Sequence, residues 1–450
     1  DTETTGLNIN FKSRIGQADQ AVGIVISIEE GTSYYFPLQH KAIKNLCGGD
    51  HKYFMERYMK PILENKDLLA HNGPFDWKVA HIYGINAHIV EDTLGLLKLT
   101  IGAEKFDFRV GLKEATAVLL HRDSLELSDL LVDNSWGESD VKFWDLPYEL
   151  VRLYACADTD NTLALWHYAK KADLLHKYNA TRVYNIEMAF GLAVAYQEFY
   201  GHCINVEQVE QLKVDTDKGM EESFKKLIDI VGHDFNPNSS QQLMQIMYDE
   251  LGYPEQINRK NNRRTSDAKA LKDLAGITDI EGKPKYPLAN ALLEYRGYEQ
   301  IRKTFIKNLD TLATEDGYIF SEVKQYGTTT GRVSIANPNY QSYNDTVKKN
   351  IVPRPGYYMT DSDYSSVEYR VLCSMAGQEE IKEAFKDPEL DYHAYQAARM
   401  FQIPYEAVTK KLRKSAKGIN FGLPYGMGDE SLGVAIFGEE TPENTREAKR

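Results

Sequence analysis

Three short stretches of the first 160 residues carry acidic side chains at spacings that could bind a metal ion. Asp1 and Glu3 are two positions apart, so a β-strand would project both from one face. Asp76 closes the sequence N-G-P-F-D, and Tyr154 and Asp158 are four positions apart, which places them on one face of a helix. Each stretch alone is compatible with a solvated surface. Neighbouring carboxylates repel one another, however, unless a cation lies between them.

Taken together, D-x-E-T, N-x-x-F-D and Y-x-x-x-D resemble, in order, the three motifs of DEDD-type 3′–5′ exonucleases, in the subgroup whose third motif carries tyrosine. The resemblance implies that Asp1, Glu3, Asp76 and Asp158 bind two divalent ions. Such a pair supplies a hydroxide nucleophile and stabilises the leaving oxygen. Hard oxygen ligands suit Mg²⁺, with Mn²⁺ as an alternative. Tyr154 is expected to orient the attacking water.

A second group of motifs begins with TTTGRVSIANPNYQ, at 328–341. On its own this is a turn-rich loop, but it resembles T-x-T-G-R-L-S-S…P-N-L-Q-N of family A DNA polymerases, the family of bacterial DNA polymerase I. The resemblance implies that Arg332 contacts the minor groove of a primer–template duplex. Asn339 and Gln341 are expected to help position that duplex.

The stretch DSDYSSVEYR, at 361–370, resembles motif A of the same family. The resemblance implies that the Asp363 carboxylate bridges two Mg²⁺ ions and that Tyr364 lends a backbone carbonyl to a metal. Glu368 would crowd the 2′ position of the sugar and thereby select deoxyribonucleotides. The sequence predicts that 359–377 runs from a strand into a helix.

The stretch RKSAKGINFGLPYG, at 413–426, resembles motif B. Arg413, Lys417 and Phe421 recur every four residues, so a helix presents them along one broad stripe. The resemblance implies that Arg413 and Lys417 bind the phosphates of an incoming nucleotide, with Lys417 as a proton donor to pyrophosphate. Phe421 would pack against the sugar, and Tyr425 would stack near the templating base. The proline before Tyr425 predicts that the helix ends or bends one turn early.

These patterns predict an α/β exonuclease domain with a ribonuclease H-like mixed sheet, then an α-rich thumb and an incomplete α+β palm and fingers of the polymerase right-hand fold. Paired strands are expected at 21–30 and 31–38, and long helices at 149–171 and 183–201. The expected domains are the exonuclease domain at 1–170 with its N-terminal strand truncated, the thumb at 180–315, part of the palm at 316–375 and part of the fingers at 376–450.

The net charge of −13 argues mildly against a polyanionic partner, but phosphate binding depends on local basic clusters. One such cluster, RKNNRR at 259–264, is either a solvated loop or a thumb loop that grips the duplex backbone through Arg259, Lys260, Arg263 and Arg264. The four scattered cysteines predict neither a zinc site nor a disulfide framework. No apolar run reaches the roughly 18 residues of a membrane span, so no membrane partner is expected.

The resemblance predicts template-directed nucleotidyl transfer with 3′–5′ proofreading, acting on primer–template DNA and dNTPs and compatible with a processivity factor. A cytoplasmic location in a bacterial cell or a phage-infected host follows from the family. No His-Asp-Glu motif, which carries the second palm aspartate, follows Asp363. We therefore expect a fragment cut at both ends that polymerises poorly alone. Two alternatives remain open: a stand-alone 3′–5′ exonuclease, and the DNA-binding part of a split polymerase completed by another chain.

Overall fold

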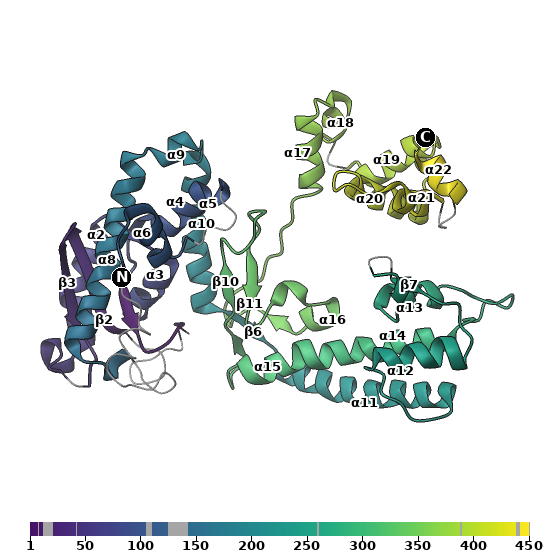
Figure 1. Ribbon diagram of the computed structural model, residues 1–450, viewed down its shortest axis with the longest axis horizontal. Helices are drawn as coiled ribbons and strands as arrows, with labels where there is room; N and C mark the ends of the chain where they lie inside the picture. The colour runs from purple at the N-terminus through teal and green to yellow at the C-terminus, as the bar shows by residue number, and fades with distance from the viewer. Residues whose placement is uncertain are drawn as a thin grey trace. The chain divides into compact units, whose positions relative to one another are not determined.

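The computed structural model describes residues 1–7, 9–11, 21–41, 43–104, 110–124, 143–258, 261–387, 389–437 and 442–449. Arg259 and Lys260 of the predicted thumb loop lie outside these residues. The chain forms two compact units, Asp1–Tyr358 and Met359–Arg450 (Figure 1). The boundary between the units falls inside the predicted palm segment, so that segment contributes to both.

The first unit begins with an antiparallel sheet of three strands, in the order β1-β2-β3. Its strands are β1 (Thr2–Thr4), β2 (Ala21–Glu29) and β3 (Thr32–Pro37). The predicted strand pair is thus confirmed, with Ile24 opposite Phe36 and the turn made by Gly31 at a φ of +83°. A separate parallel pair follows, β4 (Leu68–Ala70) and β5 (Ile89–Asp92).

Helices surround these strands. They are α1 (His51–Phe54), which continues through a π-helical turn at Met55–Met59 into α2 (Lys60–Asn65), then α3 (Gly73–Ile82), α4 (Thr93–Leu99), α5 (Ile101–Glu104), α6 (Leu112–Leu120), α8 (Tyr148–Lys171) and α9 (Leu174–Lys177). The predicted helix at 149–171 is confirmed as α8. No glycine or proline interrupts α8, and it buries Val151, Ala155 and Leu165 against the sheet and neighbouring helices.

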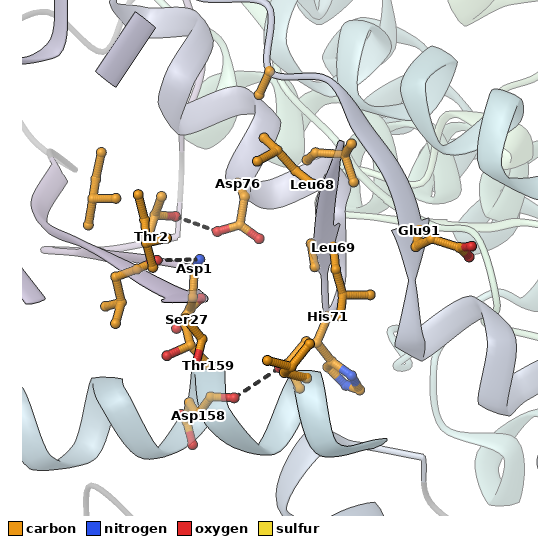
Figure 2. A pocket seen from close by; sticks show the side chains of 18 of the residues that line it. Asp1, Thr2, Ser27, Leu68, Leu69, His71, Asp76, Glu91, Asp158 and Thr159 are labelled. Carbon is orange, nitrogen blue, oxygen red and sulfur yellow. Dashed lines mark hydrogen bonds between the residues drawn. The ribbon is translucent and has the colours of Figure 1, made fainter. Parts of the chain in front are cut away.

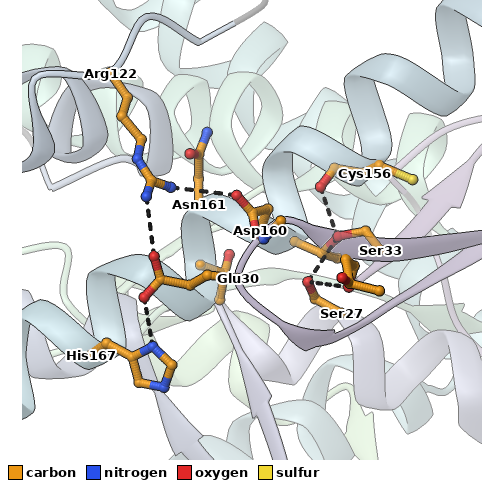
Figure 3. Close-up of polar contacts among 12 residues, drawn as sticks. Ser27, Glu30, Ser33, Arg122, Cys156, Asp160, Asn161 and His167 are labelled. Atoms are coloured by element: carbon orange, nitrogen blue, oxygen red, sulfur yellow. Dashed lines mark hydrogen bonds and ion pairs between the residues drawn. The ribbon is translucent and has the colours of Figure 1, made fainter.

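The turn between β2 and β3 is fixed to α8 by polar contacts (Figure 3). The Glu30 carboxylate lies 2.7 Å from His167 Nδ1 and accepts a hydrogen bond of 3.1 Å from Arg122. The Gly31 N–H donates to Asp160 Oδ1 at 2.5 Å. Because residues two apart on a helix point in nearly opposite directions, anchoring Asp160 to this turn directs Asp158 towards the interior.

A mainly helical region follows, as predicted. It contains α10 (Thr181–Tyr200), α11 (Val206–Val231), α12 (Ser240–Met244) with a π-helical turn at Gln245–Glu250, α13 (Ala268–Ala275), and α14 (Pro287–Gln300), which continues through Ile301–Ile306 into α15 (Lys307–Leu312). Helix α10 ends at Tyr200, one residue before the predicted end at 201, and Gly201 follows with a φ of +58°. A core that includes Leu227, Leu243, Leu271 and Leu292 joins α11, α12, α13 and α14.

Short strands complete the first unit. One sheet has the order β12-β6-β9, made of β6 (His202–Ile204), β9 (Tyr318–Ile319) and β12 (Ile351–Val352). Two antiparallel pairs are β7 (Ile257–Asn258) with β8 (Arg263–Arg264), and β10 (Glu322–Lys324) with β11 (Ser334–Ala336). Helix α16 (Asp345–Lys348) precedes β12. The segment from β10 to β11 is called the 322–336 hairpin below.

The second unit is helical in the residues that the structure describes. Its helices are α17 (Val367–Met375), α18 (Glu379–Ala384), α19 (Tyr392–Met400), α20 (Lys410–Gly422), α21 (Asp429–Phe437) and α22 (Pro442–Lys449). The strand predicted ahead of α17 is wrong, because residues 357–364 form no strand and no described segment of this unit offers a strand to pair with them. The early end predicted for the motif B helix is confirmed, since α20 ends two residues before Pro424.

No described helix is long and apolar enough to cross a lipid bilayer.

Asp92 connects two of the helices in the first unit. It is 5% exposed, and its carboxylate accepts hydrogen bonds from the Leu94 and Gly95 N–H groups at the start of α4. The same carboxylate accepts hydrogen bonds from the Asn72 and Gly73 N–H groups, 3.1 and 2.8 Å away, at the start of α3. One side chain therefore caps both helices, and α3 is the helix that carries Asp76.

Replacing Asp92 by alanine should destabilise the first unit, because it removes a helix cap and leaves buried N–H groups without an acceptor. We expect a loss of about 2–4 kcal/mol in the free energy of unfolding. The measurement is thermal or urea denaturation followed by circular dichroism. D92N keeps one acceptor oxygen and should lose about half as much, so equal stability of D92A and the wild type would contradict the role of this cap.

Candidate functional site

Three of the four predicted acidic residues line one cavity of about 540 Å³ in the first unit, and Glu3 is not among its lining residues. Asp1, Asp76 and Asp158 line it, together with apolar side chains of β2, β4 and β5. Figure 2 shows Asp76 on α3, Asp158 on α8 and Asp1 directly before β1 around this cavity. The Thr2 hydroxyl donates a hydrogen bond of 2.8 Å to Asp76 Oδ1, and this contact ties β1 to α3.

The pKa values of these acids reflect buried negative charge. Burial, followed by repulsion from Asp158 and then Asp76, raises the pKa of Glu3 to about 8, while the positive Asp1 amino group opposes the rise. Burial also raises the pKa of Asp76, and the Asp1 amino group and the Thr2 hydrogen bond lower it. The acids are therefore hard to ionise together unless positive charge is added between them.

The donor types fit a hard divalent cation, because they are carboxylates in a partly desolvated cavity. Across the described residues, however, no three His, Cys, Asp or Glu side chains converge closely enough to hold a metal ion. Tyr154 lies on α8 one turn before Asp158, with its ring 5.9 Å from that of Phe143 and 4.3 Å from the Lys113 ammonium. Metal binding would thus require side-chain rotation around the cavity.

The loop of the 322–336 hairpin presents Arg332, which is exposed. Gly331 has a φ of +77°, and the Thr328 hydroxyl donates a hydrogen bond of 2.6 Å to the Arg332 carbonyl. The Gln341 amide donates to the Val333 carbonyl at 3.3 Å, and the Asn339 side chain accepts from the Gln341 N–H at 3.1 Å. Asn339 and Gln341 therefore support the loop that carries Arg332.

Of the basic cluster at 259–264, the structure describes residues 261–264. Arg263 and Arg264 form β8, and both are exposed. Arg264 makes ion pairs with Asp249, at 2.8 Å, and with Glu255. Since its guanidinium already contacts two carboxylates, binding a phosphate there would require exchanging these partners.

In the second unit, three of the predicted nucleotide-site residues meet. Glu368, Phe421 and Tyr425 line one cavity of about 210 Å³, and the Tyr425 hydroxyl donates a hydrogen bond of 2.8 Å to Glu368 Oε2. Asp363 and Tyr364 are exposed in the segment ahead of α17. The structure thus brings together the residues predicted for the sugar and base, while the predicted metal ligands lie outside that cavity.

Helix α19 adds a residue that the sequence motifs did not identify, His393. Its ring centroid lies 5.8 Å from that of Phe421, and burial, then the charges of Arg413 and Lys417, lower its pKa. Asp391 caps α19 and binds Arg413 Nε at 2.5 Å, so it links α19 to α20. The only sequence signal is Asp391 as a helix cap, which predicts that His393 lies in the first turn of a helix.

Comparison with known proteins identifies the family. The sequence profile described as "DNA polymerase family A" matches residues 206–446, more than half of the chain. The chain belongs to DNA polymerase family A. Among its family A relatives, DNA polymerase I of Chloroflexus aurantiacus is 28% identical over 443 residues, which cover 95% of this chain and 44% of that protein. DNA polymerase I of Pseudomonas aeruginosa is 27% identical over 460 residues, or 97% and 47% of the two chains.

A solved family A structure has the same fold. The "POL domain of Pol1 from M. smegmatis complex with DNA primer-template and dNTP" superposes with a TM-score of 0.73 and 22% sequence identity. The match covers 96% of this chain and 68% of the solved one. The chain spans less than half the length of the curated family A relatives that it matches.

The raised pKa of Glu3 leads to a stability prediction. The folded chain holds a proton on Glu3 up to about pH 8, whereas the unfolded chain releases it near the ordinary value of 4.5. The free energy of unfolding should therefore decrease as the pH rises from 4.5 to about 8, and it should decrease less steeply for E3Q than for the wild type. We expect E3Q to melt a few degrees higher than the wild type at pH 8 in EDTA, because each kcal/mol of added stability raises the melting temperature by roughly 2–4 °C.

Thermal melts between pH 5 and pH 8.5 measure this difference, with E29Q at the exposed end of β2 as the control. Mg²⁺ should raise the melting temperature of the wild type more than that of E3Q. If the melting temperatures of E3Q and the wild type change with pH in parallel, burial and neighbouring charges do not raise the pKa of Glu3 in the folded chain.

Proposed function

We propose that this family A chain takes part in template-directed DNA synthesis through its second unit and removes mispaired 3′ ends at a separate exonuclease site in its first unit. The observation that carries the exonuclease proposal is the cavity lined by Asp1, Asp76 and Asp158, with Glu3 in electrostatic contact with two of these acids. The three acids come from segments far apart in the sequence, and an accidental surface cluster would not place them around one desolvated cavity.

In the proposed exonuclease reaction, Asp1, Glu3, Asp76 and Asp158 hold divalent ions, with Mg²⁺ as the physiological choice and Mn²⁺ as a substitute. Such ions supply a hydroxide nucleophile and neutralise charge on the leaving oxygen. Tyr154, one turn from Asp158 on α8, orients the attacking water through its hydroxyl. The apolar walls of the cavity limit bulk water and so strengthen these electrostatic interactions.

In the proposed nucleotide site, Arg413 and Lys417 bind the triphosphate. The His393 imidazole lies close enough to these two cations for their charges to lower its pKa. Phe421 packs on the sugar, and Glu368 limits the space at the 2′ position. The hydrogen bond from Tyr425 to Glu368 supports this role, because it fixes the carboxylate beside the cavity that Phe421 lines.

Primer–template DNA is the proposed polymer substrate. Arg332 on the 322–336 hairpin contacts the duplex, and the basic cluster that includes Arg263 neutralises phosphates. The cavity shared by Glu368, Phe421 and Tyr425 favours a polymerase over a stand-alone exonuclease, because a degenerate polymerase half would have no reason to keep these three side chains around one space. Asp363 and Tyr364 are the proposed metal ligands of this unit.

Replacing Asp76 or Asp158 by alanine should lower exonuclease activity by at least about 100-fold, because each variant removes a proposed metal ligand. Release of nucleotides from a 3′-labelled single-stranded oligonucleotide in Mg²⁺ is the measurement. Primer–template affinity, followed by fluorescence anisotropy, should stay within about twofold of the wild type, since neither acid lies on the proposed duplex surface. A large fall in affinity with unchanged cleavage would contradict the ligand role.

Replacing Phe421 by tyrosine should favour 2′,3′-dideoxynucleotides, because the new hydroxyl can take the place of the missing 3′-OH. A gained hydrogen bond of 0.5–1.5 kcal/mol corresponds to a change of about 2–12-fold in the ratio of ddNTP to dNTP affinity. Titration of the protein–primer–template complex with each nucleotide measures the ratio without requiring turnover. F437Y, at the exposed end of α21, is the control, and a ratio unchanged in F421Y would place Phe421 away from the sugar.

A further inference from the structure

Glu198 on α10 links two parts of the first unit through its two carboxylate oxygens. Oε2 accepts a hydrogen bond of 2.6 Å from the Lys78 ammonium on α3. Oε1 accepts a hydrogen bond of 2.6 Å from the Val323 N–H in β10. The Lys78 and Glu198 side chains are only 9% and 15% exposed, so the charges of the pair depend on each other rather than on water.

One side of this link reaches the carboxylate cavity. Lys78 lies two residues after Asp76 on α3, and its ammonium is 5.5 Å from the centroid of the Phe75 ring. Helix α3 also packs on α10 through Trp77, which contacts Ala195 and Phe199. Because a hydrogen-bonded ion pair has a preferred geometry, the contact between Lys78 and Glu198 fixes the position of α3, which carries Asp76, along α10.

The other side of the link reaches the loop that carries Arg332. Val323 packs with Val194 of α10 and with Ile335 of β11. Further along the hairpin, the Gln325 amide donates hydrogen bonds of 2.6 and 2.8 Å to the Glu187 carboxylate and carbonyl. The base of the 322–336 hairpin is therefore anchored along α10, and its N–H at Val323 depends on Glu198 for an acceptor.

We propose that Glu198 is a positioning residue shared by the two sites: Oε2 sets the position of α3 and Asp76, and Oε1 sets the position of the hairpin and Arg332. The proposal rests on the exonuclease and duplex-binding roles proposed above. Neither Glu198 nor Lys78 touches the reacting atoms in this scheme. Its consequence is that the two oxygens can be separated by mutation, since each serves a different site.

Glu198→Gln keeps an oxygen for the Val323 N–H but places an uncharged amide against Lys78. Lys78→Met removes the ion pair from the other side and leaves the Val323 contact in place. Glu198→Met removes both contacts. Glu294→Gln is the matched control, because Glu294 forms an exposed ion pair with Lys226 between α11 and α14.

The experiment measures two quantities for each variant: kcat and KM for Mg²⁺-dependent degradation of a single-stranded oligonucleotide, and the Kd of a primer–template duplex. E198Q and K78M should lower kcat about 10-fold or more with little change in KM, because a displaced ligand helix acts on the chemical step. Both should keep the duplex Kd within about twofold. E198M should lower kcat equally and also weaken duplex binding about 10-fold.

A merely structural ion pair gives a different pattern, in which every loss follows the melting temperature. The double variant K78M/E198M tests this, because an apolar pair in place of a buried ion pair often restores stability. Recovered stability with kcat and duplex affinity still low supports the proposal, and recovery of both activities overturns it. Equal duplex affinities for E198Q and E198M overturn the proposed role of Glu198 Oε1 in positioning the hairpin. A wild type that degrades no oligonucleotide refutes the exonuclease proposal instead, and the duplex affinities then still test the role of Oε1.

Discussion

Buried negative charge is the constraint on which the first unit depends, and the fold meets it in two ways. Asp92 is compensated by four backbone N–H groups and Glu198 by an ammonium and an N–H group. Burial raises the pKa values of Asp92, Glu3 and Asp76 alike, but four backbone N–H groups oppose the rise at Asp92, whereas Asp76 accepts a hydrogen bond from Thr2 and lies near the Asp1 amino group. Asp92 and Glu198 hold α3, α4, α10 and the 322–336 hairpin together, whereas Asp76 lines a cavity in which added positive charge would be bound favourably.

The two units use their charged residues differently. In the first unit, Asp1, Asp76 of α3 and Asp158 of α8 line a cavity with mainly apolar walls. In the second unit, Arg413 and Lys417 lie on α20, whose Phe421 lines a smaller cavity, and Asp391 pairs with Arg413 while capping α19. An acidic cavity favours bound cations and basic side chains favour bound anions, and these two environments occupy separate units of the chain.

Much of the local structure could be predicted from the sequence, because it follows from short-range rules. The β-branched and aromatic residues of 21–38 predict β2 and β3, and uninterrupted periodicity predicts α8. Pro424 predicts the early end of α20. Motifs in the sequence single out Glu368, Phe421 and Tyr425, and the structure places these three side chains around one cavity. The strand ahead of α17 failed, because a strand forms only against a partner strand and local sequence does not reveal whether one is present.

Long-range partners could not be predicted. Glu198 lies 120 residues from Lys78 and 125 from Val323, and no periodic pattern relates these positions. Likewise, Arg264 in a basic run meets Asp249 and Glu255 only after folding.

The proposed exonuclease site of the first unit has a defined polarity, which the product ladder from a 5′-labelled single-stranded oligonucleotide reports directly. We expect stepwise shortening from the 3′ end that requires Mg²⁺ or Mn²⁺ and stops on chelation. Degradation from the 5′ end, or an intact oligonucleotide at saturating metal, would contradict it.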